Sequence, residues 1–293
     1  MSEITLLSSP APLARPSSGH ENERSCTCLA EWQAAIVNIR AIGALVIKEL
    51  FRRKDFYALF ILTALITLIL GSVNFFNEAH VVRYLKEICL FLIWTSSLVI
   101  AITTTARQIP VERESRTIFP LLAKPVTRPH LILGKFLGCW QACGIALFVF
   151  YLFFGIVSGA REHQWPITQY FQAITLHWFM LGVVIAMTLL GSLVFAAPSS
   201  NNTITFVVAV GILLVGRHLN KLALQVHEPG QTLVYAIYFA IPHLELFDMR
   251  DLVIHQLGSI EWLIWFGALG YAAVYAALFL LAACLVFRRK ALN

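Results

Sequence analysis

Five long stretches of this chain contain no Asp, Glu, Lys or Arg, and they limit the folds that it can adopt. The stretches are Phe56–Asn77, Ile88–Ala106, Phe136–Ala160, His163–Gly216 and Trp262–Phe287. A helix that crosses a bilayer needs about 20 consecutive apolar residues, and every stretch is close to or beyond that length. Only 13% of the 293 residues are charged, well below the roughly 25% of a soluble domain. The sequence therefore predicts an integral membrane protein.

The stretch His163–Gly216 has 54 residues, which is too many for one crossing of the membrane. Pro198, followed by Ser and Asn residues as far as Asn202, predicts a turn at 197–202 that divides it into two helices. We therefore predict an all-α, polytopic membrane protein with six transmembrane helices. The predicted spans are about 56–76, 88–107, 133–158, 168–196, 203–225 and 261–287.

Lys and Arg are unevenly distributed among the segments that connect these spans. Sixteen of the 22 lie in the N-terminal region, the segment between spans 2 and 3, and the C-terminal tail, which share one side of the membrane. Because basic residues are retained on the cytoplasmic side, we predict that both termini are cytoplasmic. The net charge of +6 then reflects this topology and contact with membrane lipids. No nucleic-acid partner is expected, because no basic stripe is present.

Two different segments precede the first span. Residues 1–28 are rich in Ser, Pro and other polar residues, which predicts a disordered cytoplasmic tail. Residues 29–54 carry apolar residues at alternating spacings of three and four and end in cationic residues, which predicts a helix in the membrane interface. An extra span is disfavoured, because Arg40 and Lys48 are only eight positions apart. The apolar stripe consists of Leu29, Trp32, Ile36, Ile39, Gly43, Val46 and Leu50.

A polar block, Gln108–Lys135, separates spans 2 and 3. Glu112 and Arg116, four residues apart, predict a short helix at its start. Three later prolines predict non-helical turns. A short amphipathic helix held between two spans is suited to docking in a soluble partner's groove, so we predict a cytoplasmic coupling helix here. A merely solvated loop is the alternative. The prolines are Pro120, Pro125 and Pro129.

Two further patterns concern packing. Gly134, Gly138 and Ala142 are spaced four apart on span 3, which predicts the close approach of a neighbouring helix. Between spans 5 and 6, apolar residues recur over 233–241 and 244–257. They predict two short outer helices that lie on or dip into the membrane.

The sequence does not match known catalytic or metal-binding motifs. Gly134-Lys135 fails as a phosphate-binding loop, because Pro129 and Phe136 occupy positions that require Gly and Ser or Thr. Cys26 and Cys28 are too few ligands for a structural metal site, so no metal or cofactor is expected in this chain. An intramembrane enzyme that uses histidines such as His177 or His243 is the weakest alternative.

The polar block resembles the corresponding loop in permease subunits of ABC-2 type ATP-binding-cassette exporters. Those loops show a Glu-rich start, a Thr-Ile step, a Leu pair, a Pro-Val-Thr-Arg turn and Gly-Lys at the start of the third span. Here these are Glu112-Arg113-Glu114, Thr117-Ile118, Leu121-Leu122, Pro125-Val126-Thr127-Arg128 and Gly134-Lys135. The resemblance covers a transmembrane domain at about 29–293. The subgroup resembled most includes permeases associated with maturation of multicopper enzymes.

This resemblance implies a multi-pass permease of the bacterial inner membrane rather than an enzyme. It implies a homodimer, or a heterodimer with a sister permease, with two cytoplasmic ATPase subunits that bind ATP and Mg²⁺. A periplasmic partner would fit the same arrangement. The alternative is a membrane scaffold or sensor that recruits a partner through residues 108–130, and the substrate stays open. The docking contacts implied are Glu112, Arg113, Glu114, Arg116, Thr117, Leu121, Pro125 and Arg128.

Overall fold

The computed structural model describes residues 37, 39–49, 52, 54–72, 78–114, 128–163, 165–223, 232, 241–255 and 257–289. The chain divides into two compact units, Met1–Val37 and Asn38–Asn293, and every element named below belongs to the second unit. Within the described ranges the regular structure is helical and includes no strand, so the predicted all-α class is confirmed. The predicted tail at 1–28 lies outside the described residues.

The described helices span most of the second unit. Residues 39–49 form a helix within the segment predicted to be interfacial. The later elements are α2 (Lys54–Ser72), α3 (Glu78–Ala106), α4 (Pro110–Glu114), α6 (Arg128–Glu162), α7 (Ile167–Val194), α8 (Pro198–Ala223), the 3₁₀ helix η1 (Leu244–Phe247), α10 (Arg250–Ile254) and α11 (Trp262–Arg289).

Four segments of the described chain are long and apolar enough to cross a membrane: Arg83–Arg113, Pro129–Arg161, Ile167–Val194 and Trp262–Arg289. Within α8, Pro198–Leu214 forms a shorter apolar helix. The 19-residue α2 overlaps the first predicted span. The chain is therefore a polytopic membrane protein, and a helix overlaps each of the six predicted ranges.

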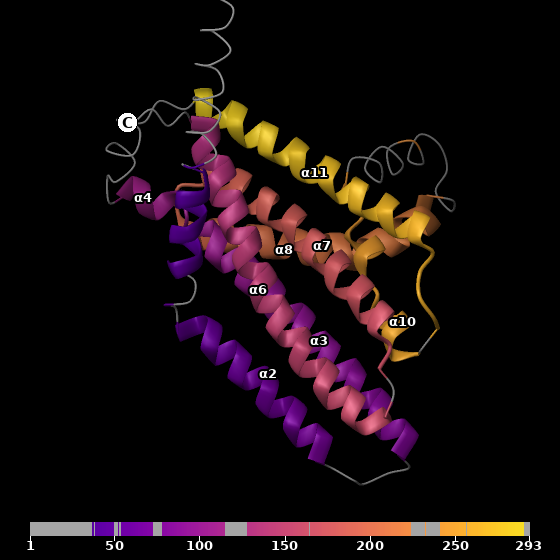
Figure 1. Ribbon diagram of the computed structural model, residues 1–293. Coiled ribbons are helices and arrows are strands. Elements are labelled where there is room, and N and C mark those ends of the chain that lie inside the picture. The colour runs from indigo at the N-terminus through magenta and orange to yellow at the C-terminus, as the bar shows by residue number, and fades with distance from the viewer. Residues whose placement is uncertain are drawn as a thin grey trace, which may run out of the picture. The chain divides into compact units, whose positions relative to one another are not determined.

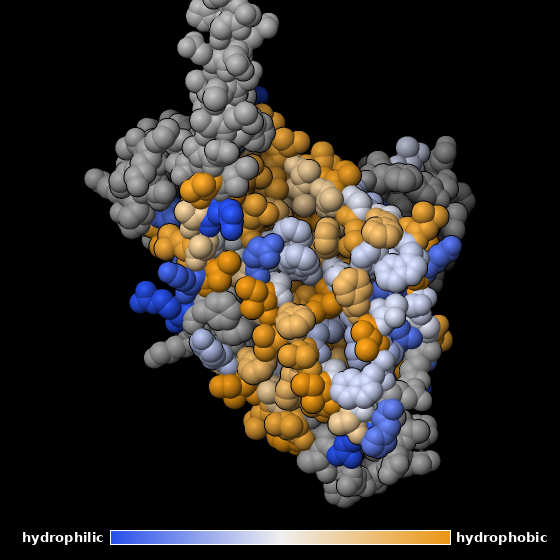
Figure 2. All heavy atoms as spheres, viewed as in Figure 1, coloured by the Kyte–Doolittle hydropathy of each residue, from blue (hydrophilic) through white to orange (hydrophobic). Residues whose placement is uncertain are grey.

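Large apolar side chains remain exposed on α2 and α11. Ile61 and Leu65 of α2 and Leu263, Phe266 and Leu281 of α11 are each more than half exposed. Apolar side chains are spread over the face seen in Figure 2. A soluble monomer rarely exposes so much contiguous apolar area, whereas lipid hydrocarbon accommodates it without cost.

Helix α7 packs against α3, α6, α8 and α11 (Figure 1). Most of its residues from Leu176 to Leu193 are buried, including small ones such as Gly182 and Ala186. A helix that is apolar around its whole circumference is buried on all sides, and small residues let its neighbours approach closely. The four neighbouring helices are therefore arranged around α7.

The predicted turn at 197–202 is wrong in its position. The chain leaves α7 at Phe195, whose backbone N–H donates to the Gly191 carbonyl at 2.8 Å, and α8 already begins at Pro198. Proline suits the first position of a helix, where its missing N–H is not needed. Asn201 is fully buried, and its side-chain amide donates to the Thr188 carbonyl of α7 at 3.1 Å. A tertiary hydrogen bond thus places this Asn inside a helix.

The predicted start of span 3 also needs correction. Helix α6 begins at Arg128, so Pro129 lies in its first turn instead of in a loop. The physical reason is again that a proline in the first turn of a helix breaks no helical hydrogen bond. Lys135, the last residue of the polar block, is buried in the bundle with a side chain that is 2% exposed.

The outer segment before span 6 is less regular than predicted. Within 244–257 the structure has two short pieces, η1 and α10, in place of one helix. They are separated at Asp248, whose carboxylate accepts hydrogen bonds from the backbone and the guanidinium of Arg250. Such local side-chain bonding competes with helix continuation. The other predicted outer helix, 233–241, lies outside the described residues except for Ile241.

Candidate functional site

A buried lysine joins α6 to the segment where α3 passes into α4. Lys135 Nζ forms an ion pair with Glu112 Oε1 at 2.7 Å. It also donates to the Gln108 carbonyl at 3.1 Å and to Gln108 Oε1 at 3.3 Å. An ammonium group has three donor hydrogens, and these three acceptors match that number. We call Gln108, Glu112 and Lys135 the α4 junction.

The junction extends to the helix at residues 39–49. The Gln108 side-chain amide donates to Glu49 Oε2 at 3.4 Å. Gly43 and Gly138 meet where this helix crosses α6, and a Cβ atom on Gly138 would lie 2.8 Å from the Gly43 Cα and 2.9 Å from the Val46 Cβ. The backbones therefore approach as closely as only glycine permits. Three segments far apart in sequence are thus joined around Gln108.

Of the other predicted packing residues, Gly134 lies on the same side of α6. A Cβ atom there would be 3.0 Å from the Ile42 Cβ and 3.3 Å from the Ile39 carbonyl oxygen. Ala142 is fully buried one turn beyond Gly138. Gly134 and Gly138 therefore lie along the crossing of α6 with the helix at residues 39–49.

The local sequence explains why Glu112 reaches Lys135. Helix α3 ends at Ala106, and a turn carries the chain into α4, where the Val111 N–H donates to the Arg107 carbonyl at 3.2 Å. Pro110 occupies the first position of α4, as expected for proline. Glu112 follows in the first turn of α4, where an acidic residue is favoured by the helix dipole.

The structure describes only part of the predicted docking set. Glu112 has a side chain that is 22% exposed and turns inward to Lys135, while Arg113 is partly exposed on α4. For Glu114 and Arg128 only the backbone is described, in α4 and at the start of α6. Val111, which we did not predict as a contact, is 48% exposed. Outside the described residues lie Arg116, Thr117, Leu121 and Pro125.

Two tryptophans lock α6 to α7. Trp140 Nε1 donates to the Trp178 carbonyl at 2.9 Å, and Trp178 Nε1 donates to the Trp140 carbonyl at 3.0 Å. Their rings stack with centroids 4.5 Å apart. Each ring covers a glycine of the other helix, Trp178 over Gly144 and Trp140 over Gly182. We call these four residues the tryptophan clasp.

The sequence carried a signal for this clasp that we did not use. Trp140-x-x-x-Gly144 on one helix and Trp178-x-x-x-Gly182 on the next repeat the same spacing. On antiparallel helices, that spacing places each large ring opposite the other helix's smallest residue. The pattern is informative only once the two helices are known to be neighbours.

A second polar contact connects α3, α6 and α7. His177 Nε2 lies 2.9 Å from Ser97 Oγ, and His177 Nδ1 lies 3.3 Å from the Tyr151 hydroxyl. The Trp94 ring packs beside the imidazole, with centroids 5.9 Å apart. All of these side chains are buried. Both imidazole nitrogens face hydroxyl partners, which is typical of polar side chains that hold membrane helices together.

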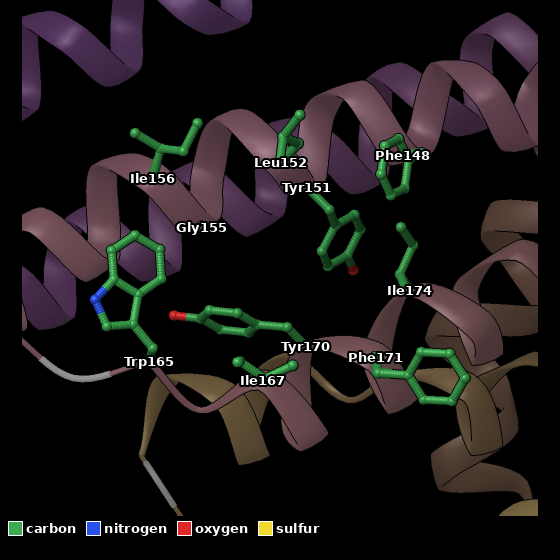
Figure 3. A pocket seen from close by; sticks show the side chains of 10 residues that line it. All are labelled: Phe148, Tyr151, Leu152, Gly155, Ile156, Trp165, Ile167, Tyr170, Phe171 and Ile174. Carbon is green, nitrogen blue, oxygen red and sulfur yellow. The ribbon is translucent and has the colours of Figure 1, made fainter.

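A hollow lies along the outside of α6 and α7. One part, of about 290 Å³, is bordered by Trp165 and Tyr170, and Figure 3 shows the Tyr170 ring across the hollow below α6. The Tyr170 hydroxyl donates to Ser158 Oγ at 3.3 Å. A neighbouring part, of about 370 Å³, is bordered by Gln141 and Trp178, and both parts share Phe148, Phe171 and Ile174. These surfaces are apolar and suit a hydrocarbon chain better than an ion.

Metal-binding chemistry finds no support in the described part of the chain. Among those residues, no three His, Cys, Asp or Glu side chains lie close enough together to hold a metal ion. Cys26 and Cys28 lie outside the described residues.

The membrane-length helices define a multi-pass helical membrane protein. The family model described as ABC-2 family transporter protein matches residues 35–292, which is most of the chain. The chain therefore belongs to the ABC-2 transporter family, as the resemblance of its loop predicted. A search among curated proteins gave no match. Family membership makes the chain the membrane component of an ABC transporter.

Proposed function

We propose that this chain is the permease subunit of an ATP-driven exporter, and that a separate ATPase subunit acts on it at α4. Family membership supports the permease role. The observation that carries the coupling role is the ion pair of 2.7 Å between Lys135 and Glu112. This ion pair connects α4, the short helix to which a soluble partner could bind, to α6, a long helix of the bundle.

In the proposed mechanism, closure of the ATPase subunits displaces α4. Separating Lys135 from Glu112 and Gln108 would leave a buried charge without its counterion, which costs about 3–5 kcal/mol. Helix α6 therefore follows α4 in preference to detaching from it. The tryptophan clasp passes this movement to α7, and α7 packs against α3, α8 and α11.

The proposal places α4 and both termini in the cytoplasm, in agreement with the distribution of Lys and Arg. Two ATPase subunits would bind the ATP and Mg²⁺, and a second copy of this chain or a sister permease would complete the membrane part. The bacterial inner membrane is the compartment that this assembly requires. The subgroup associated with multicopper enzymes stays a prediction.

The test measures ATP hydrolysis by the partner ATPase with this chain in lipid nanodiscs. Arg113→Glu reverses a partly exposed charge on α4, and Arg289→Glu reverses an exposed charge on the same predicted side but at the end of α11. We expect Arg113→Glu to reduce the stimulation of ATP turnover at least about fivefold, because a reversed contact charge repels its partner. Arg289→Glu should leave the stimulation unchanged.

Equal stimulation by wild-type chain and Arg113→Glu would refute α4 as the docking surface. No stimulation by the wild-type chain, together with retained binding of a cytoplasmic protein, would favour the scaffold alternative.

A further inference from the structure

A cavity of about 560 Å³ lies between α3 and α10. Its volume is within the range of pockets that bind small molecules. On α3 the contributing positions are three and four residues apart, which puts them on one face of that helix. Helix α10 closes the opposite side. The residues on which the inference depends are Tyr84, Glu87 and Phe91 from α3, and Arg250, Asp251 and Ile254 from α10.

Among the described residues of the cavity wall, the one cationic side chain, Arg250, is already neutralised. Arg250 donates from Nε to Asp248 Oδ1 and from Nη2 to Asp248 Oδ2, both at 2.8 Å. Its guanidinium also lies 4.9 Å from the centroid of the Trp94 ring. A bidentate pair of this kind holds the arginine in place and leaves little charge to attract an anion.

The carboxylates of Glu87 and Asp251 face the cavity as exposed groups. Within the part of the chain that the structure describes, neither forms an ion pair of 4 Å or less. Arg83, one turn before Glu87, points to His255, with Nη2 3.4 Å from His255 Nε2. The cavity wall therefore has a negative balance.

We propose that this cavity binds the ammonium group of an organic cation, with the Tyr84 ring and the two carboxylates as its recognition elements. Tyr84 is more than half exposed, so its ring face is accessible to a ligand, whereas the Arg250 guanidinium already lies over the Phe91 ring, 6.0 Å from its centroid. An ammonium group is attracted to aromatic faces, and the two carboxylates add charge complementarity. Ile254 supplies apolar surface for the adjoining carbon atoms.

The cation has two sources with the same chemistry. One is the headgroup of an aminophospholipid such as phosphatidylethanolamine, and the other is a free alkylammonium compound. The inference does not depend on the proposed coupling to an ATPase, because it concerns residues of α3 and α10 that take no part in the α4 junction.

The experiment has one arm for each source. In the first, the full chain in neutral detergent receives equal amounts of phosphatidylethanolamine and phosphatidylglycerol, and native mass spectrometry counts the lipids retained. In the second, tetramethylammonium is added, and saturation-transfer NMR measures its binding. The double variant Glu87→Gln/Asp251→Asn removes both charges from the cavity. Glu261→Gln is the matched control, because it removes an exposed carboxylate that does not line the cavity.

We expect the double variant to weaken binding about tenfold and Glu261→Gln to leave it unchanged. Tyr84→Leu should weaken binding about two- to fivefold, the effect of one aromatic face at an exposed site. Preferential retention of phosphatidylethanolamine identifies the headgroup as ligand, whereas binding of tetramethylammonium alone identifies a free cation. No binding in either arm, or equal binding by wild type and double variant, overturns the proposal.

Discussion

Replacing either partner of the ion pair between Glu112 and Lys135 should destabilise the protein, but by unequal amounts. Glu112→Gln leaves a lysine whose side chain is 2% exposed, and Gln108 remains as its neutral acceptor. Removing one member of a buried pair costs about 3–5 kcal/mol. Because the two bonds to Gln108 persist, we expect about 3 kcal/mol.

The reverse substitution leaves a less buried charge. In Lys135→Met the remaining charge is Glu112, whose side chain is 22% exposed and can turn to water. Methionine fills most of the volume of the lysine stem, so we expect a loss of about 1–2 kcal/mol. The double variant should be no less stable than Glu112→Gln alone, since it contains neither charge.

The assay is equilibrium unfolding of the purified chain in mixed micelles, followed by circular dichroism. The free energy of unfolding should be highest for the wild type, lower for Lys135→Met and lowest for Glu112→Gln. The double-mutant cycle should give the coupling free energy between the two sites. A larger loss for Lys135→Met than for Glu112→Gln would refute the reasoning. It would mean that Lys135 is stabilised mainly by groups other than Glu112.

Two further substitutions test the helix contacts by the same unfolding assay. Gly138→Ala places a Cβ atom 2.8 Å from the Gly43 Cα and should lower the free energy of unfolding by about 1–3 kcal/mol. The control Gly267→Ala has open space around it and should be neutral or slightly stabilising. Equal effects of the two substitutions would argue against the close crossing. Trp178→Phe removes the donor of a part-buried hydrogen bond to the Trp140 carbonyl and part of the stacked ring surface, so a loss of about 1–3 kcal/mol is expected. An unchanged free energy of unfolding would show that the reciprocal bond contributes nothing.

Fold class was predictable because the bilayer imposes a simple rule on composition. Any run of about 20 apolar residues must form a helix there, since lipid offers no partner for backbone N–H and C=O groups. The helix boundaries were less predictable. Pro129 and Pro198 both indicated turns, yet each lies in the first turn of a helix. In the sequence, a proline in a turn just before a helix cannot be distinguished from a proline at the first position of that helix. Only the neighbouring contacts decide between these two placements.

The candidate site was predictable only in part. The sequence drew attention to Glu112 because it lies in a polar block between two spans, but nothing local showed that its carboxylate binds Lys135, 23 positions later. Lys135 closed the polar block at the start of the predicted third span, and no local signal predicted its burial, because lysine is rarely buried. Its burial depends on three acceptors that come together only when the bundle forms.

The sequence by itself determined the class of this protein: an all-α membrane chain with a polar block between two spans, whose motif resembled the ABC-2 family. These properties depend on composition and on residues close together along the chain, which act before any tertiary contact exists. The tertiary structure decided which helices are neighbours, and with that the partner of Lys135, the tryptophan clasp and the cavity beside Glu87. Each of these needs side chains from separate helices within a few ångströms of one another, and hydrophobic patterns do not encode that proximity because lipid-facing and helix-facing residues are equally apolar.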